Sequence, residues 1–199
     1  MTIDKKTIDF YNRGAKKYAS WSASIERLKL LQNFILDIPE EGKILDFGCG
    51  TGWATSYFCS KSYFVTAMDA SKGMLDEIPK DDNIDIVCGD FLSLSHKNFF
   101  DAVWACFSLQ HAPRNEISTI LALINRSLKI NGKLYIGIHE GEKTIRDSLG
   151  RYYCYYMENE IKDLLLKEGF NVHKLSKHES IGYDGSSINI MNIDIKKIN

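Results

Sequence analysis

The stretch that decides the fold is Ile44-Leu45-Asp46-Phe47-Gly48-Cys49-Gly50-Thr51-Gly52. An apolar strand that runs straight into glycines and then into a helix exposes backbone N–H groups at the start of that helix, where they bind anionic groups. Gly48 and Gly50 permit positive φ angles, which lets a ligand come close to the backbone. By itself this loop predicts nucleotide-type binding in general, because many nucleotide-binding folds use one.

The spacing of the glycines narrows the choice of ligand. A dinucleotide fingerprint G-x-G-x-x-G that began at Gly48 would need a glycine at position 53, where the chain has Trp53. The indole would obstruct the close helix–strand packing that this glycine permits. No Lys-Ser or Lys-Thr pair follows the glycines, so a P-loop is excluded too. The loop therefore favours a ligand with a carboxylate and an amine, and an NAD-dependent oxidoreductase is the weaker hypothesis.

Outward from the loop, short apolar strands alternate with helical stretches. The predicted strands are residues 43–47, 63–68, 84–88, 101–106 and 133–139. The helices predicted between them lie near residues 53–60, 72–77 and 115–128. Strands that are buried on both faces and alternate with helices indicate an open parallel α/β sheet, which binds ligands beyond the carboxyl ends of its strands.

Both ends of the chain depart from this alternation. Apolar residues recur at three- and four-residue spacing through the first 40 residues, which predicts a helical segment ended by Pro39 and Gly42. Residues 158–167 are predicted to form a helix that stops at Gly169, and residues 170–175 and 188–198 to form strands. The link between these strands is short and rich in Gly, Ser and Asp, so they are expected to pair as an antiparallel hairpin.

The composition limits the classes of function. The chain has 199 residues, 44% of them hydrophobic and 26% charged, with a formal net charge of −1, so nothing in it draws in nucleic acid or an acidic membrane. The first six residues lack the apolar stretch of a signal peptide, and no apolar run approaches the roughly 20 residues of a membrane span. The five cysteines form no C-x-x-C pair, and no metal-ligand spacing is present, so we expect a cytoplasmic protein without a metal.

The order of short motifs resembles the class I S-adenosylmethionine-dependent methyltransferases. Residues 44–52 look like the first motif of that family, and residues 65–71 look like its second strand with an acidic end. Residues 89–91 resemble the turn after its third strand, and residues 100–103 and 108–111 resemble its fourth-strand region. Residues 128–134 resemble the turn into its fifth strand. The closest likeness is to the small-molecule (type 11-like) branch, because residues 10–18 resemble its N-terminal cap and 152–170 its region between strands five and six.

This resemblance implies the fold in more detail. We expect a Rossmann-like, seven-stranded, mostly parallel sheet with a C-terminal antiparallel hairpin and helices on both faces. Residues 1–199 would form a single methyltransferase domain, with a helical cap at 1–40 and an α/β core that binds S-adenosylmethionine at 43–199.

The resemblance also implies S-adenosyl-L-methionine as the methyl donor. The residues that it assigns to this cofactor are Tyr11, Tyr18, Asp46, Gly48, Cys49, Gly50, Gly52, Asp69, Ala70, Met74, Asp90, Phe91 and Cys106. Asp69 would accept hydrogen bonds from the ribose hydroxyls, and Asp90 one from the adenine amino group. Structural alternatives stay open: Asp69 as a helix cap, Asp90 as a turn residue, and Met74 and the two tyrosines as core packing.

His111 is the candidate catalytic residue, because a histidine with a pKa of about 6.5 can accept a proton at neutral pH. It could equally hold the loop after the fourth strand through backbone hydrogen bonds, and His139 is a comparable candidate. Tyr152, Tyr153, Tyr155 and Tyr156 form an aromatic cluster that could wall a substrate pocket or pack as an amphipathic segment.

The sequence therefore predicts an enzyme that transfers a methyl group to a small molecule, chiefly by aligning the acceptor. Residues 105–108 lack the Asn/Asp-Pro-Pro-Tyr motif that grips an amide or an exocyclic amine, so nucleic-acid and protein-glutamine acceptors are disfavoured. The alternative is a non-catalytic sensor or partner subunit that binds S-adenosylmethionine or S-adenosylhomocysteine on the same fold. No motif specifies the acceptor or the oligomeric state.

Overall fold

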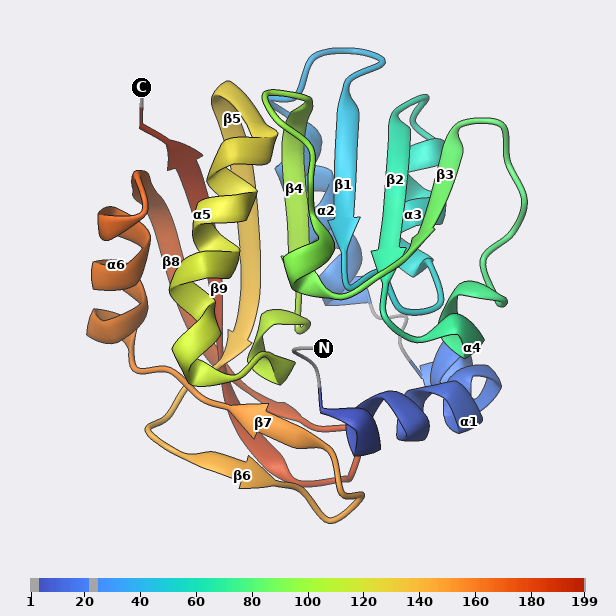
Figure 1. Ribbon diagram of the computed structural model, residues 1–199, viewed down its shortest axis with the longest axis vertical. Coiled ribbons are helices and arrows are strands. Elements are labelled where there is room, and N and C mark those ends of the chain that lie inside the picture. Colours follow the sequence, from blue (N-terminus) through green and yellow to red (C-terminus); the bar gives the residue numbers. More distant parts are fainter. Residues whose placement is uncertain (1–3, 22–24, 199) are drawn as a thin grey trace.

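The computed structural model describes residues 4–21 and 25–198. Its main feature is a seven-stranded sheet in the order β3-β2-β1-β4-β5-β9-β8 (Figure 1). The strands are β1 (Lys43–Phe47), β2 (Phe64–Asp69), β3 (Ile84–Cys88), β4 (Phe100–Cys106), β5 (Leu128–His139), β8 (Phe170–Ile181) and β9 (Ser187–Lys197). The five strands β1 to β5 pair with their neighbours in parallel, in the pairs β3–β2, β2–β1, β1–β4 and β4–β5. Strand β9 is antiparallel to both β5 and β8. This confirms the expected mostly parallel Rossmann-like sheet with its C-terminal antiparallel hairpin.

Helices cover both faces of the sheet, as predicted. They are α1 (Lys5–Trp21), α2 (Ile25–Ile35), α3 (Trp53–Cys59), α4 (Lys72–Leu75), α5 (Ile117–Ser127) and α6 (Glu158–Lys167), with 3-10 turns η1 (Phe91–Ser93), η2 (Leu109–His111) and η3 (Arg114–Glu116). In Figure 1, α5 and α6 lie in front of the sheet, and α2 and α3 lie behind it. The predicted helical segment at residues 1–40 corresponds to α1 and α2 within the described residues.

The largest differences from the predicted bounds occur in β5 and β8. Strand β5 begins at Leu128, which pairs with Phe100 before an irregularity in the ladder between Phe100 and Ala102. Polar residues such as Asn131 interrupt its apolar pattern, which is why the sequence predicted only residues 133–139. Strand β8 extends to Ile181 because its outer half pairs with β9 on the exposed surface, where no buried face imposes apolar alternation.

A small two-stranded ribbon was not predicted. It consists of β6 (Thr144–Arg146) and β7 (Tyr152–Cys154), paired antiparallel with Ile145 opposite Tyr153. Strands of three residues are shorter than the stretch over which alternation can be recognised. The ribbon lies at the same end of the molecule as α1, beyond the carboxyl ends of the parallel strands (Figure 1).

The core has one apolar layer on each face of the sheet. The layer on the α5 and α6 side contains Leu121 from α5 and Leu165 from α6, and the layer on the other side contains Phe34 from α2 and Phe58 from α3. Strand β4 contributes to both layers, because alternate side chains of a strand point to opposite faces. The central parallel strands are therefore buried on both faces, as their continuous apolar runs predicted.

Helix α1 is attached to both sides of the sheet's carboxyl edge. On one side, the Asn12 carboxamide oxygen accepts hydrogen bonds from the Ser71 hydroxyl (2.8 Å) and from Gly73 N (2.9 Å) beside α4. On the other side, Tyr152 N of β7 donates to the Thr7 hydroxyl at 2.8 Å. These bonds hold α1 across the strand ends as a cap. Among the described residues, no helix combines the length and the apolarity that crossing a membrane requires.

The core assignment can be tested with two matched leucines. We expect Leu121→Ala, which removes a fully buried side chain, to lower the free energy of unfolding by about 2–5 kcal/mol. Leu36→Ala, at a position 77% exposed, should change it by less than about 0.5 kcal/mol. Denaturant titration of both variants measures the difference, and equal effects would contradict the described packing.

Candidate active site

A cavity lies at the carboxyl ends of β1, β2 and β4, with α1 as one wall. Its lining includes His111 and every predicted cofactor residue except Gly52 and Asp90. The predicted cofactor residues in this lining are Tyr11, Tyr18, Asp46, Gly48, Cys49, Gly50, Asp69, Ala70, Met74, Phe91 and Cys106. Parallel pairing places the carboxyl ends of neighbouring strands at one edge, and α1 brings Tyr11 and Tyr18 to the same edge.

The glycine loop is held on the end of the neighbouring strand β2. The Met68 carbonyl oxygen accepts hydrogen bonds from Gly48 N (2.8 Å) and Cys49 N (3.1 Å). Gly48 has a φ of +77°, and a Cβ there would lie 2.2 Å from the Cβ of Ser108, so only glycine fits. A Cβ at Gly50 would meet no atom within 4 Å, so the loop presents bare backbone toward the cavity at this position.

Asp69 ends β2 and joins the glycine loop to the start of α4. Its Oδ2 accepts a hydrogen bond from Gly50 N (2.9 Å), and its Oδ1 accepts one from Ser71 N (2.8 Å). Burial raises the pKa of this carboxyl, while the same backbone hydrogen bonds lower it. An ionised carboxylate offers about four lone-pair sites, so each oxygen of Asp69 has capacity for a further donor in the cavity.

Asp46 is the most deeply buried acid of the cavity wall. Its side chain is 2% exposed, and its Oδ2 accepts a hydrogen bond from the Thr55 hydroxyl of α3 at 2.7 Å. Burial raises the pKa of Asp46 to about 7, against the opposing effect of the Thr55 hydrogen bonds. A carboxyl with this pKa ionises fully when a cationic group binds beside it.

Two predicted residues lie outside the cavity lining. Asp90 accepts a hydrogen bond from Ser93 N at 3.1 Å and caps η1, which is the turn role left open above. Gly52 packs against Ile78, which follows α4 in the chain. A Cβ at Gly52 would lie 2.8 Å from the Ile78 side chain. Gly52 therefore supports the loop by close packing, and a contact of either residue with a ligand stays a prediction.

The other predicted residues near η1 and α4 form an apolar wall. Phe91 is buried and packs edge-on against Phe47, with ring centroids 5.1 Å apart. Met74 is 2% exposed and lies in the same cavity lining. Both side chains are thus buried and also line the cavity, and contact of Met74 with the cofactor stays a prediction.

His111 is buried, and both of its ring nitrogens have partners. Its Nδ1 lies 2.7 Å from the Tyr152 carbonyl oxygen, which can only accept, so Nδ1 carries the proton. Its Nε2, 3.0 Å from the Tyr11 hydroxyl, therefore accepts. Burial lowers the pKa of His111 to about 4. This geometry favours the structural role that the sequence left open, and catalysis by His111 stays a prediction.

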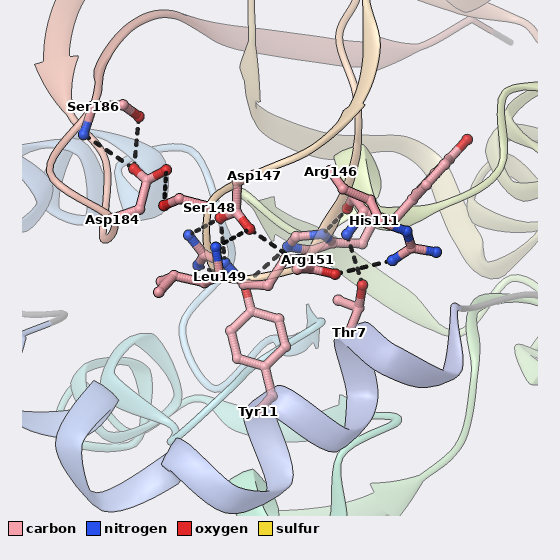
Figure 2. A network of polar contacts seen from close by, with 12 residues as sticks. Thr7, Tyr11, His111, Arg146, Asp147, Ser148, Leu149, Arg151, Asp184 and Ser186 are labelled. Carbon is pink, nitrogen blue, oxygen red and sulfur yellow. Dashed lines mark hydrogen bonds and ion pairs between the residues drawn. The ribbon is translucent and has the colours of Figure 1, made fainter.

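Tyr11 connects His111 to a buried ion pair. Figure 2 shows the Tyr11 side chain pointing from α1 toward His111 and Arg151. Arg151 donates to the Tyr11 hydroxyl at 3.3 Å, and its Nη2 lies 2.6 Å from Asp147 Oδ2, with both partners of this pair nearly fully buried. Burial raises the pKa of Tyr11, so its hydroxyl remains a proton donor. The network joins α1 to the chain around β7.

The cysteines of the cavity wall are not arranged for nucleophilic catalysis. Burial raises the pKa of the Cys49 thiol well above its usual range and that of Cys106 to about 12, so both stay protonated at neutral pH. Within residues 4–21 and 25–198, no three His, Cys, Asp or Glu side chains are grouped in a way that could hold a metal ion.

Several cavity residues were not predicted. Arg27 of α2 and Phe107, directly after β4, line the cavity, and the Arg27 guanidinium carbon lies 5.3 Å from the Phe107 ring centroid. Phe107 has a φ of +56°, a conformation that bulky residues rarely adopt and that marks functional sites. Neither residue stands in a motif, so only the fold could have identified them. Arg13 of α1 is exposed, and its Nε donates to the Asp9 carbonyl oxygen at 3.1 Å.

The raised pKa of Asp46 makes stability depend on pH. The unfolded state loses its proton near the ordinary value of 3.8 and the folded state near 7, so between these values Asp46 destabilises the fold progressively as pH rises. Asp46→Asn keeps an oxygen for Thr55 but cannot ionise. We expect its stability relative to the wild type to increase by up to about 1.4 kcal/mol per pH unit between pH 4 and 7.

Urea titration of both proteins at several pH values measures this difference. Asp163→Asn, at an exposed position on α6, is the control and should change stability by under about 0.5 kcal/mol. A difference between Asp46→Asn and the wild type that stays constant from pH 4 to 7 would show that Asp46 is ionised in the folded state throughout.

Comparison with known proteins finds methyltransferases that are similar to this chain. A family model described as "Methyltransferase domain" matches residues 44–132. An "Uncharacterized methyltransferase" from Staphylococcus carnosus is 28% identical over 156 residues, which cover 70% of this chain and 75% of that protein. A malonyl-[acyl-carrier protein] O-methyltransferase from Priestia megaterium is 32% identical over 135 residues, covering 62% of this chain but only 47% of its relative.

A solved structure agrees in fold over nearly the whole chain. The 1,6-didemethyltoxoflavin-N1-methyltransferase from Burkholderia thailandensis, solved with 1,6-didemethyltoxoflavin and S-adenosylhomocysteine, superposes with a TM-score of 0.79 at 17% identity. The match covers 98% of this chain and 88% of that one. This chain is therefore similar to S-adenosylmethionine-dependent methyltransferases, in sequence across the glycine loop and in fold over nearly its whole length.

Proposed function

We propose that this chain binds S-adenosylmethionine in the cavity above the glycine loop and transfers its methyl group to a small-molecule acceptor. The observation that carries the proposal is the Asp69 carboxylate, held at the end of β2 by Gly50 N and Ser71 N and facing the cavity. A carboxylate fixed in this way is suited to accept hydrogen bonds from two neighbouring ribose hydroxyls.

The remaining wall fits the other parts of this cofactor. Phe91 and Met74 offer an apolar surface for a flat adenine ring. Asp46 supplies a carboxylate for an amino group, and Arg27 a cation for a carboxylate. The bare backbone at Gly50 leaves the space that a close approach needs. The described cavity wall therefore has a group suited to the sugar, to the base and to the amino-acid part of the cofactor, and none of these groups is a pyrophosphate site.

The work left to the chain's residues is positioning. When bound, S-adenosylmethionine supplies a methyl group on a positively charged sulfur, which is already a strong electrophile. The cap helix α1 forms one wall of the cavity and is held there by hydrogen bonds to Ser71, beside α4, and to Tyr152 of β7. His111 orients Tyr11 on the wall shared with the acceptor, and a base role for it would first require breaking its hydrogen bond from Tyr11.

A small molecule is the acceptor class that the comparisons support. The Burkholderia thailandensis protein was solved with 1,6-didemethyltoxoflavin, a small molecule. The sensor alternative on the same fold differs in one measurable respect, because a sensor would bind the cofactor without turning it over.

The cofactor assignment can be tested at Asp69. We expect Asp69→Asn to weaken binding of S-adenosylmethionine and S-adenosylhomocysteine by about 10–100-fold, because the carboxamide replaces one accepting oxygen with a donating NH₂ group. Isothermal titration calorimetry measures the affinities. Asp85→Asn, an exposed carboxylate on β3, is the matched control and should bind like the wild type. An unchanged affinity in a folded Asp69→Asn variant would remove Asp69 from the site.

The function as a whole is tested in two steps. Titration with S-adenosylmethionine, S-adenosylhomocysteine and NAD should give binding of the first two only. Incubation with S-adenosylmethionine carrying a labelled methyl group and with fractionated small-molecule extract should then move label into a low-mass product. Binding of NAD, or binding of the cofactor with no labelled product from any fraction, would contradict the proposed enzyme.

A further inference from the structure

A second chamber opens beside the cofactor cavity. It is smaller than the first cavity and shares four wall residues with it, Tyr11, Tyr18, Arg27 and Phe107. Its remaining walls come from Gln110 of η2, from the end of β5, from the chain around β7 and from the tip of the β8–β9 hairpin. A molecule in this chamber therefore lies next to whatever occupies the cofactor cavity.

The walls of the chamber are mostly aromatic rings. Tyr153 and Tyr155 point into it from the chain around β7, and Tyr183 closes it from the hairpin tip. Tyr156, by contrast, packs in the core, and Tyr152 packs against it. Alternate tyrosines of the aromatic cluster therefore line the chamber and contact the core. Flat rings along the walls favour a flat, unsaturated ligand, which can stack or pack edge-on against them.

His139 is the polar group of the chamber without a partner. It is 7% exposed, and its buried Nδ1 has no hydrogen-bond partner in the described part of the chain. Its ring is parallel to that of Tyr153, at an interplanar angle of 5°, and lies edge-on to Tyr155. A buried nitrogen without a partner costs stability, and native structures retain such a group where a ligand or water satisfies it.

The buried cation of the chamber is already neutralised. Arg151 makes two short contacts to Asp147, from Nε at 2.8 Å and from Nη2 at 2.6 Å. Its guanidinium carbon also lies within 5.2 to 5.8 Å of the ring centroids of Phe10, Tyr11, Tyr153 and Tyr183. Burial lowers the pKa of His139 to about 3, so its ring is neutral at physiological pH. The lining also contains Arg27 and Asp184, so its two arginines and two aspartates carry no net charge that would attract an ion.

From these contacts we infer that the chamber is the acceptor site and that it takes a flat, uncharged aromatic or heteroaromatic ring with an N–H or O–H at its edge. His139 Nδ1 receives the hydrogen bond from that edge, which makes His139, and not His111, the histidine that contacts the acceptor. This assignment rests on the proposed function, because it takes the neighbouring cavity to hold the cofactor.

The test uses the full chain saturated with S-adenosylhomocysteine and ligand-observed NMR titrations. The probes are flat, uncharged bicyclic and monocyclic lactams, among them quinazoline-2,4-dione and uracil. Each is paired with counterparts that change one property: 1,3-dimethylquinazoline-2,4-dione lacks the N–H groups, and 5,6-dihydrouracil lacks the flat ring. We expect the flat N–H members to bind at least about 5-fold more tightly than either kind of counterpart.

Variants of the chamber identify the contact. His139→Ala should weaken the flat N–H probes by about 5–30-fold and remove their advantage over the N-methylated probes, while His139→Asn should restore part of it. Both should bind S-adenosylhomocysteine like the wild type, since His139 does not line the cofactor cavity. His173→Ala, an exposed histidine on β8, is the control. Tyr155→Leu gives a second readout should His139→Ala not fold, with an expected 3–10-fold loss.

The outcomes separate this inference from the function on which it rests. Failure of S-adenosylhomocysteine to bind the wild type would overturn the proposed function. If the wild type binds S-adenosylhomocysteine, three results would overturn the acceptor assignment alone. These are that no probe binds, that the flat N–H probes bind no more tightly than their counterparts, or that His139→Ala discriminates between the probes as the wild type does.

Discussion

The site depends on one constraint, the parallel pairing of β1 with β2 and β4. This register places the end of β1 beside Met68, whose carbonyl accepts from both Gly48 N and Cys49 N. Asp69, the next residue, then reaches Gly50 N. The glycine loop is thereby bonded to the neighbouring strand before any ligand arrives, so the cavity is largely preformed. Pre-formed sites lose less conformational freedom on binding.

The same edge of the sheet concentrates groups that do not favour the folded state. Asp46 is buried with a raised pKa, and His111 and His139 are buried with lowered ones. Phe107 adds a left-handed backbone conformation. The two apolar layers on either side of the sheet offset these costs, because they bury leucine, isoleucine and phenylalanine side chains completely. Stability thus comes from the faces of the sheet and function from its edge.

Much of the fold was predictable because local patterns and tertiary structure agree. The strands 43–47 and 84–88 and the helix 158–167 have the predicted bounds, since each is a short apolar or amphipathic run with a clear stop. The predicted cofactor residues also converge, apart from Gly52 and Asp90, because most follow the ends of parallel strands and Tyr11 and Tyr18 lie on α1, which crosses those ends. The β6–β7 ribbon was missed, because three-residue strands carry too little periodicity to stand out.

The histidines show where sequence alone stops. Two of them, His111 and His139, were comparable candidates, and only packing distinguishes them: Tyr11 and the Tyr152 carbonyl occupy both nitrogens of one, whereas Nδ1 of the other is buried among rings without a partner in the described chain. The sequence by itself determined the parallel sheet and the glycine loop, since strand period and glycine geometry act over a few residues. Only the tertiary structure decided which side chains surround the second chamber, because they come from α1, α2, η2, β5, β7 and the β8–β9 tip, segments far apart in the chain whose contacts no local pattern encodes.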